Sequence, residues 1–346
     1  MKRYLSYRQR QRRKRKQKVS ILFLAILVFI GVKSYTFKHG PIFSYARDHN
    51  FAVSAANLTE KIADLSPDEF AADASAQIID EVEGDGELAL EIKGDLNEML
   101  GEVKACINSK PPKIIGARDK LGSMLEMSMN TGQAALVKEQ LSTLSDKWLF
   151  NNIVFEGDRF CSKYEVQPGD LLSVISKKFK VPYEILMRIN NISDARSLRA
   201  GRAIKVIAGP FHCRISRLRF RMDLYLQDTF VRSFEVGVGK GGMETPTGTW
   251  RVRSDGKMIS PTWTDSESGR VYHSSDADYP LGTRWIGLEG VDGLAQGRDG
   301  FALHGTKDPE GLGTASSRGC IRLANDDIEL LYELLMPGVS QVVVVE

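Results

Sequence analysis

The sequence predicts a multidomain protein with an N-terminal membrane helix, a helical spacer, a small β-α-α-β module and a mostly-β C-terminal domain with one late helix. Three observations predict this class. A basic run leads into an uncharged apolar run near the N-terminus, residues 57–104 combine acids with spaced apolar residues, and strict alternation of apolar residues begins after residue 213. The length of 346 residues is enough for two or three domains.

The N-terminal segment is first basic and then apolar. Residues 1–18 carry ten Lys and Arg and no acid, and the following 14 residues carry no charge. As a helix this apolar run is about 21 Å long, short of the roughly 30 Å core of a bilayer, which favours the core of a cleaved signal peptide. However, no small-residue cleavage site follows, and Lys33 can reach back to the interface and extend the span.

These features favour an uncleaved signal anchor at residues 19–37, with residues 1–18 as a cytoplasmic tail, over a cleaved signal peptide. Either alternative exports the rest of the chain. A basic tail can also bind nucleic acid, but its position beside an apolar run favours the membrane. The predicted partner of this segment is therefore a membrane, and no nucleic-acid partner is predicted.

Residues 38–113 are predicted to form an acidic spacer. Within residues 57–104 there are fourteen Asp and Glu against three Lys, and glycines interrupt apolar residues that recur loosely at helical spacing. The acids lack the regular pattern of a calcium loop, and the His and Cys residues lack zinc-ligand spacing, so no metal and no cofactor are predicted. Residues 114–160 are predicted to form a helical hairpin with its turn at residues 130–132.

Residues 162–207 are predicted to form a compact β-α-α-β unit. A strand begins at Lys163 and ends at a turn containing Gly169, two short helices follow, and a strand returns at residues 198–207. This order, with the pattern Tyr-x-Val-x-x-Gly-Asp early and an Asn late, resembles a LysM module.

LysM modules bind polymers of N-acetylglucosamine, including peptidoglycan, in a groove between the first turn and the second helix. The resemblance implies that the following residues lie at this groove: Gly169, Asp170, Leu171 and Asn190. Gly-Asp and Asn are also ordinary turn residues, so a purely structural role is the alternative.

Residues 211–346 are predicted to form the mostly-β domain. Apolar and polar residues alternate from residue 218 to residue 226, and a turn at residues 227–228 leads to a partner strand. One late helix is expected to begin at Asn325, which is predicted to be its N-cap because acids follow it in the first turn. A final strand is predicted at residues 342–345.

The polar stretch at residues 254–280 is long for a connection. It is either a flap over a site, with Trp263 and Trp285 as walls, or an ordinary surface loop.

One His and one Cys in the C-terminal domain form a candidate catalytic pair. His304 and Cys320 are sixteen positions apart, and Gly319, Arg318 and Arg322 surround the Cys. A thiol attacks as the thiolate, which positive charge favours, and an imidazole can take its proton. Gly319 permits a sharp bend that directs the N–H groups of Gly319 and Cys320 at a developing oxyanion. A Cys in a strand is more often a small buried residue, but a core strand does not need two Arg beside it.

Three ordered segments resemble the L,D-transpeptidase catalytic domain of the YkuD type. They are the Thr-Pro-Thr-Gly segment within residues 239–250, the segment at residues 279–286, and the pair formed by His304-Gly305-Thr306 and residues 317–322. The resemblance covers residues 211–346. Many members carry a second His directly before the Gly-Cys pair, whereas this chain has Arg318 there.

The resemblance implies an enzyme that cuts peptidoglycan stem peptides after the third residue of a donor tetrapeptide. Cys320 would form an acyl thioester, with His304 as base and then as acid toward the leaving D-alanine, and an amine from another stem would resolve it into a crosslink. The predicted substrate-binding residues are Arg322, Arg318, Ser317 and Gly305. No third side chain obviously orients His304, so a backbone carbonyl such as that of Gly305 is expected to do so.

Two alternatives stay open. Water in place of the amine would make the protein an L,D-carboxypeptidase on the same substrate, and an inert β domain would make it a non-catalytic peptidoglycan-binding membrane protein. The expected location is the bacterial cell membrane, crossed once, with the catalytic domain outside the cytoplasm.

The four cysteines allow at most one disulfide if Cys320 stays free. Cys161 and Cys213 flank the LysM-like module and are the best candidates for a bridge outside the cytoplasm, with Cys106 as a competitor.

Overall fold

The computed structural model describes residues 86–346, with side chains from residue 96 onward. The predicted tail at residues 1–18, the predicted anchor at residues 19–37 and most of the acidic spacer lie outside the described residues. Among residues 86–346, no helix combines the length and apolarity needed to cross a bilayer.

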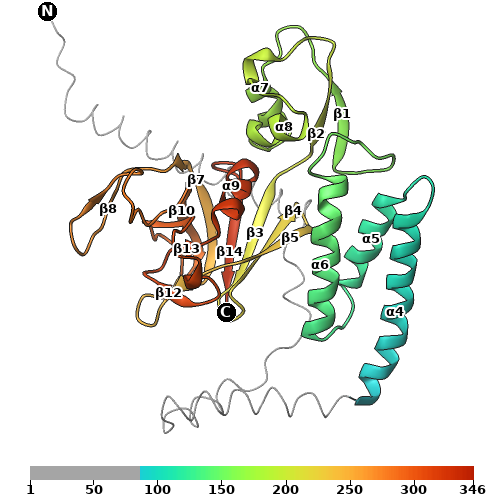
Figure 1. Ribbon diagram of the computed structural model, residues 1–346, viewed down its shortest axis with the longest axis horizontal. Coiled ribbons are helices and arrows are strands. Elements are labelled where there is room, and N and C mark those ends of the chain that lie inside the picture. The colour runs from blue at the N-terminus through green and yellow to red at the C-terminus, as the bar shows by residue number, and fades with distance from the viewer. Residues whose placement is uncertain (1–85) are drawn as a thin grey trace, which may run out of the picture. The chain divides into compact units, whose positions relative to one another are not determined.

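Three helices open the described part of the chain (Figure 1): α4 (Gly86–Asn108), α5 (Ile114–Met124) and α6 (Thr131–Trp148). The end of the acidic spacer is thus one continuous helix, not the interrupted pieces that its glycines predict. Leu96 and Val103 lie two turns apart on one face of α4 and are buried. Packing of this face therefore outweighs the poor helix propensity of Gly94 and Gly101.

The second helix of the predicted hairpin begins with a capping box. The Asn130 Oδ1 accepts the Gln133 N–H at 2.9 Å, and the Asn130 N–H donates to the Gln133 Oε1 at 3.0 Å. This pair satisfies two amide groups that a helix start otherwise leaves without partners. The predicted turn residues thus become the N-terminus of α6.

The next segment has the predicted β-α-α-β order. The strands β1 (Cys161–Glu165) and β2 (Ala203–Ile207) pair antiparallel, and between them in the chain lie α7 (Leu172–Lys178), α8 (Tyr183–Ile189) and a short 3-10 helix (Ala195–Ser197).

A buried ionic cluster joins this module to the helical hairpin. The side chain of Arg118 is 1% exposed, lies 2.8 Å from the fully buried Asp158 carboxylate and stacks 4.6 Å from the ring of Trp148. The Lys205 ammonium donates to the carbonyls of Trp148 and Ile153 at 2.5 and 2.8 Å. Burial lowers the pKa of Lys205. These contacts fix the module against the end of α6.

We expect Arg118→Ala to lower the free energy of unfolding by about 3–5 kcal/mol, because it leaves the Asp158 carboxylate buried without its cation. Urea unfolding followed by circular dichroism measures this. Arg196→Ala is the matched control, since the Arg196–Asp194 pair is exposed and such pairs contribute at most about 1 kcal/mol. Equal effects of the two substitutions would contradict the prediction.

The C-terminal domain is built on an eight-stranded sheet with the order β13-β11-β10-β7-β14-β3-β4-β5. In chain order these strands are β3 (Phe211–Ser216), β4 (Arg221–Leu226), β5 (Thr229–Glu235), β7 (Gly248–Ile259), β10 (Arg284–Gly293), β11 (Phe301–His304), β13 (Ile321–Arg322) and β14 (Gln341–Val345). The predicted alternation is confirmed in β4, where Met222, Leu224 and Leu226 are buried. The predicted last strand, β14, lies inside the sheet between β3 and β7.

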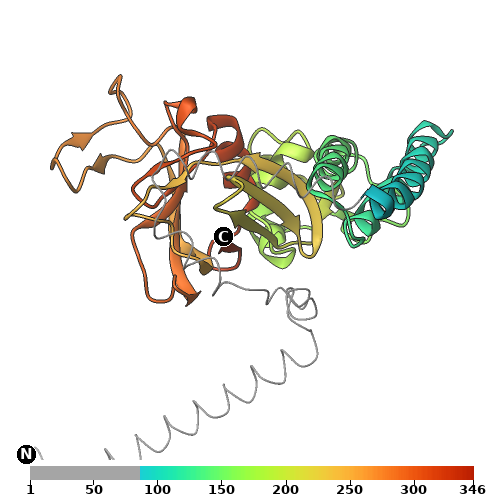
Figure 2. The ribbon, with the colours of Figure 1, turned by 90° about the horizontal axis from the view of Figure 1, so that it is seen from below.

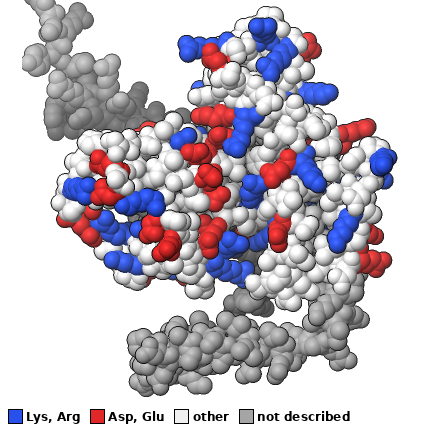
Figure 3. Space-filling view, in the orientation of Figure 1, with Lys and Arg blue, Asp and Glu red and all other residues white. Residues whose placement is uncertain are grey.

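Smaller elements surround the sheet. A two-stranded pair joins β6 (Val238–Gly239) to β12 (Ala315–Ser317), and a short 3-10 helix spans Pro309–Gly311. The strands β8 (Trp263–Thr264) and β9 (Val271–Tyr272) form a hairpin, called the flap below, that stands out from the sheet in both ribbon views (Figures 1 and 2). Basic and acidic side chains are interspersed across the face shown in Figure 3.

The late helix, α9 (Asn325–Leu334), begins where expected, but its predicted N-cap is wrong. Ala324 occupies the N-cap position, and Asn325 is already helical. The Asn325 side chain instead bonds two loops described below, which is why it does not cap its own helix.

The candidate bridge between Cys161 and Cys213 is not formed, because all four cysteines are free thiols. Cys161 lies on the two-stranded sheet of the module and Cys213 on β3 of the large sheet. Both are buried, so each contributes as a small apolar side chain.

Candidate active site

The predicted catalytic pair lies at one edge of the large sheet. The strands β11 and β13 are parallel, with Leu303 opposite Ile321 and His304 opposite Arg322. Because side chains alternate along a strand, this register continued by one residue puts Cys320 beside Ala302 and on the same face of the sheet as His304. His304 is 6% exposed, and Cys320 is half-buried. Pairing of two short strands thus brings the two residues together.

The imidazole of His304 is held from two sides. Its Nδ1 lies 2.6 Å from the carbonyl oxygen of Gly305, and its ring stacks on Trp285 with centroids 5.7 Å apart and planes inclined by 14°. Because a carbonyl only accepts, Nδ1 carries the hydrogen and Nε2 is left as the base. The predicted backbone orienter is therefore confirmed, and Trp285, one of the two candidate walls, covers one face of the imidazole.

Burial decides the charge state of the pair. It lowers the pKa of His304 to about 4, against the opposing effect of the Gly305 carbonyl. Burial also raises the pKa of the Cys320 thiol, although the Ala302 N–H, Arg322 and Arg318 oppose it. The pair thus consists of a neutral thiol and a neutral imidazole at pH 7, although the two flanking Arg favour the thiolate.

We expect the rate of Cys320 acylation to vary by less than about twofold between pH 5.5 and 7.5, because His304 stays neutral until the pH falls toward about 4. An unperturbed histidine would instead give a decline centred near about pH 6.5. Stopped-flow acylation by a soluble donor, with circular dichroism at each pH, measures the profile. A fall in the acylation rate centred between pH 6 and 7 would show that His304 is not shielded from water.

The turn that carries Cys320 depends on glycine and on two hydroxyl groups. Gly319 has φ +110°, and a Cβ there would lie 2.8 Å from the Phe301 ring. Its N–H donates to the Ser317 Oγ at 3.1 Å, and the Ser317 hydroxyl donates to the Cys320 carbonyl at 2.6 Å. Ser317 is buried and shapes this turn, so its predicted contact with substrate is not supported. The Gly319 N–H already has an acceptor, so its predicted role toward an oxyanion is not supported either.

Thr245 braces the same turn from the Thr-Pro-Thr-Gly segment. Its hydroxyl donates to the Gly319 carbonyl at 2.8 Å and accepts the Gly239 N–H at 3.1 Å, and the residue is fully buried. Sequence reasoning did not assign this role, although the unusual density of small residues around Thr245 is a signal of close backbone approach.

Asn325 is the second residue that sequence reasoning missed. Its Oδ1 accepts the Thr283 N–H at 3.1 Å, and its Nδ2 donates to the Thr306 carbonyl at 3.0 Å. The fit is close, because a Cβ on Gly282 or Gly305 would lie 2.2 or 2.3 Å from the Asn325 Oδ1. Asn325 therefore holds in place the loop whose Gly305 carbonyl orients His304.

Arg318 is bound to the flap. Its guanidinium lies 2.9 Å from both the Asp265 and the Glu267 carboxylates, and this cation lowers the pKa of Asp265. The prediction that Arg318 binds the substrate carboxylate is therefore not supported, because flap acids already occupy it. Trp263, the other candidate wall, packs against Tyr272 of the flap, with ring centroids 5.7 Å apart and planes inclined by 34°.

Arg322 has no such acid. It lies opposite His304 in the β11–β13 register, and its guanidinium donates to the Ser316 Oγ at 3.3 Å. Within residues 96–346 it forms no ion pair with a carboxylate. Of the two predicted cations, Arg322 is thus the one available to a substrate carboxylate.

The predicted glycan-binding residues of the module divide into two groups. Asn190 is buried, with both hydrogens of its amide given to the carbonyls of Leu186 and Lys205 and its oxygen accepting the Lys205 N–H, so its predicted sugar contact is wrong. Asp170 accepts from the Tyr164 hydroxyl and the Gln167 N–H, both at 2.8 Å, and forms the turn.

The other two predicted residues are accessible. Gly169 has φ +88° with open space around it, and Leu171 is 60% exposed. Val174, one turn further on, is also exposed. An apolar surface at the start of α7 is therefore open to a ligand.

Comparison with known families matches both parts of the chain. Residues 212–344 match the L,D-transpeptidase catalytic domain, YkuD, and residues 164–206 match the LysM domain. A Bacillus licheniformis protein assigned to the L,D-transpeptidases as YkuD is 26% identical over 182 residues, which cover 51% of this chain and 94% of that protein. YcfS of Escherichia coli K12, assigned to the same class, is 28% identical over 189 residues, which cover 49% of this chain and 57% of that protein.

Among solved structures, the catalytic domain of the Enterococcus faecium L,D-transpeptidase is 18% identical with a TM-score of 0.30, over 39% of this chain and 95% of that chain.

Proposed function

The chain carries an L,D-transpeptidase catalytic domain of the YkuD type behind a LysM domain, and from this premise we propose that it crosslinks peptidoglycan stem peptides through an acyl thioester on Cys320. The observation that carries the proposal is the placement of Cys320 and His304 on one face of adjacent strands, with Nε2 as the basic nitrogen of His304.

The first half-reaction begins from the neutral pair. As the Cys320 sulfur attacks the donor carbonyl, His304 Nε2 takes the thiol proton, and the Gly305 carbonyl stabilises the imidazolium through Nδ1–H. The tetrahedral intermediate then collapses, the carbon–nitrogen bond breaks, and His304 returns the proton to the leaving amine. A thioester remains on Cys320.

The second half-reaction reverses these roles. An acceptor amine attacks the thioester carbonyl, His304 takes a proton from the amine, and the thiol leaves with that proton when the new amide forms. We assign the oxyanion to the Cys320 N–H, because the Gly319 N–H is bonded to Ser317. Arg322 is the proposed partner of a substrate carboxylate.

The test is to incubate the protein with a labelled donor tetrapeptide and an acceptor stem, and to identify the products by mass spectrometry. Crosslinked dimers support the transferase, and tripeptides alone would replace it with an L,D-carboxypeptidase. A carbapenem that adds its mass at Cys320 supports a reactive thiol. Failure of both acylation and transfer would leave a non-catalytic peptidoglycan-binding protein.

We further propose that the LysM domain binds glycan through the surface at Leu171 and Val174. Leu171→Asp is expected to weaken binding to insoluble peptidoglycan about tenfold, because burying a leucine contributes about 1.5 kcal/mol. Co-sedimentation with purified peptidoglycan measures this. The matched control is Leu294→Asp, which changes a leucine that is 70% exposed on the catalytic domain. Equal binding by the two variants would place the glycan elsewhere.

The location is proposed from the sequence. Residues 19–37 are proposed to cross the membrane once as a signal anchor, with residues 1–18 in the cytoplasm and the catalytic domain outside it. Retention of the full chain in membranes after alkaline washing supports this, and release into the soluble fraction would overturn it.

A further inference from the structure

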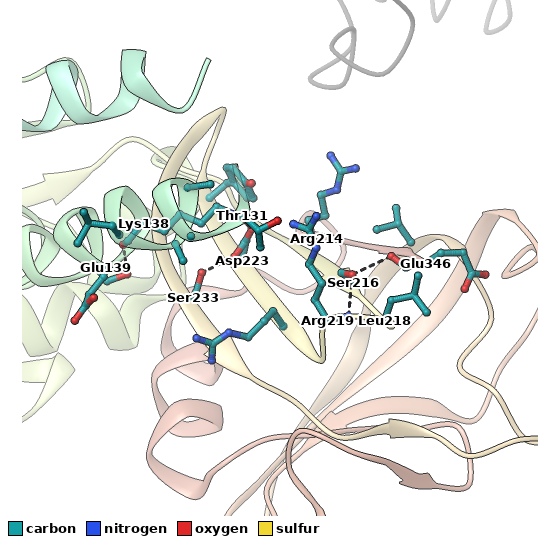
Figure 4. Close-up of a pocket in the computed structure, with 18 residues that line it drawn as sticks. Thr131, Lys138, Glu139, Arg214, Ser216, Leu218, Arg219, Asp223, Ser233 and Glu346 are labelled. Carbon is teal, nitrogen blue, oxygen red and sulfur yellow. Dashed lines mark hydrogen bonds and ion pairs between the residues drawn. The ribbon is translucent and has the colours of Figure 1, made fainter. Parts of the chain in front are cut away.

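An open groove lies away from the catalytic pair. It encloses about 1200 Å³ between α6 and the face of β3, β4 and β5 (Figure 4). These strands form one end of the sheet order, and the catalytic strands β11 and β13 form the other. The groove therefore belongs neither to the active site nor to the LysM surface.

Three arginines without partners line this groove: Arg214 on β3, Arg219 in the following turn and Arg221 on β4. All are exposed, and none forms a hydrogen bond or ion pair through its guanidinium with the part of the chain that the structure describes. Other described arginines pair with a carboxylate or donate to an oxygen, as Arg251 does to Glu289. The exception outside the groove is Arg199, in the LysM domain.

The acidic side chains that line the groove do not neutralise the three arginines. Asp223 lies opposite Arg214, but its carboxylate bonds to the Lys138 ammonium at 2.6 Å and to the Ser233 hydroxyl at 2.5 Å. The Glu346 side chain pairs with Arg217, which leaves Glu139 on α6 as the lining acid without an ion pair. Three unpaired arginines therefore face one unpaired acid side chain in this groove.

The three arginines lie near the turn that joins β3 to β4. Arg214 lies opposite Asp223 and Ser216 opposite Arg221, so Arg214 and Arg221 are diagonal neighbours about 7–8 Å apart. Arg219 lies in the turn that joins β3 to β4, two residues before Arg221, and lines the same groove. Guanidinium groups bind carboxylate and phosphate groups through paired hydrogen bonds, so three unpaired guanidinium groups along one groove can each hold one group of a repeating anionic chain.

We propose that this groove binds a linear polymer that carries phosphate or carboxylate groups. The polymer lies along β3 and β4 against α6, and its anionic groups pair with Arg214, Arg219 and Arg221. This contact gives the protein a third attachment, independent of the glycan and of the stem peptide.

The test measures binding of fluorescent linear polyphosphate and fluorescent poly-L-glutamate to the full chain in detergent, by anisotropy at several salt concentrations. The double variant Arg214→Gln/Arg221→Gln is expected to lose about tenfold in affinity and to show a shallower salt dependence, because fewer counterions are released. Arg199→Gln, the matched unpaired arginine, is expected to stay within about twofold of the parent. The polymer that binds more tightly identifies phosphate or carboxylate as the anionic group.

Several results would overturn the proposal: no binding of either polymer to the parent protein, or an equal loss in Arg199→Gln and the double variant. The variant Arg214→Lys/Arg221→Lys keeps both positive charges and is expected to bind the polymer more tightly than Arg214→Gln/Arg221→Gln. If both double variants bind equally weakly and have the melting temperature of the parent protein, the proposal is also contradicted. Acyl transfer between soluble peptides is expected to be unchanged in the Gln variant, so failure here is distinguishable from failure of the proposed enzyme function.

Discussion

Replacing Cys320 with alanine is expected to abolish thioester formation and to lower acyl transfer by about 10⁴-fold or more, because removal of a covalent nucleophile leaves only binding and oxyanion stabilisation. Intact-protein mass spectrometry after incubation with a donor peptide or a carbapenem detects the adduct directly. The thiol contacts the Gly300 carbonyl, at 3.9 Å, and the Ala302 N–H, and both are weak hydrogen bonds for sulfur, so the fold is expected to survive the change.

The matched control for this experiment is Cys106→Ala, which removes another half-buried free thiol, on α4. It is expected to keep full activity and the full mass shift. An adduct that persists in Cys320→Ala, or disappears in Cys106→Ala, would show that the nucleophile has been assigned to the wrong cysteine.

Asn325→Ala is expected to lower kcat/KM by about 10²-fold, although Asn325 does not touch the reacting atoms. Its side chain joins the Thr283 and Thr306 loops, and without it Gly305 is free to shift away from His304. A loosened loop admits water to the imidazole, so the pKa of His304 is expected to rise from about 4 toward its ordinary value. A larger fraction of His304 is then protonated below pH 7, so the fall in reaction rate on the acid side begins at a higher pH than in the parent protein.

This pH shift separates positioning from general destabilisation. Asn130→Ala is the matched control, because it removes a capping asparagine from α6 and is expected to lower stability by about 1 kcal/mol. Its pH–rate profile is expected to match that of the parent. If Asn325→Ala loses activity but its rate falls at the same acidic pH as that of the parent protein, Asn325 supports the fold and not the orientation of His304.

Local pattern was sufficient for most of the elements and for the catalytic pair. Alternation identified β4, the order of strand and helix signals identified the β-α-α-β module, and His304 and Cys320 stood out because glycine and arginine surround the cysteine. The role of the Gly305 carbonyl was also predictable, since Gly305 is the next residue in the chain. Each of these inferences depends on neighbours within a few positions.

Other assignments depended on contacts between distant segments. Arg318 pairs with flap acids about fifty positions earlier, and Asn325 bonds Thr283 rather than its own helix. A basic residue beside a catalytic cysteine and an asparagine at a helix start have obvious local roles, and sequence reasoning chose those roles. The resting charge state of the Cys–His pair also depends on folding, because burial outweighs two nearby arginines only once the sheet has closed around them.

The sequence by itself determined which residues can do chemistry and in what order the elements follow, because residue type and short-range periodicity are properties of the chain. Only the tertiary structure decided which polar groups are already satisfied, as for Asn190, Ser317 and Arg318, and which are left for a ligand, as for Arg322 and the arginines of the groove. Hydrogen bonds and ion pairs form between groups that folding brings together, so their allocation cannot be read before the partners meet.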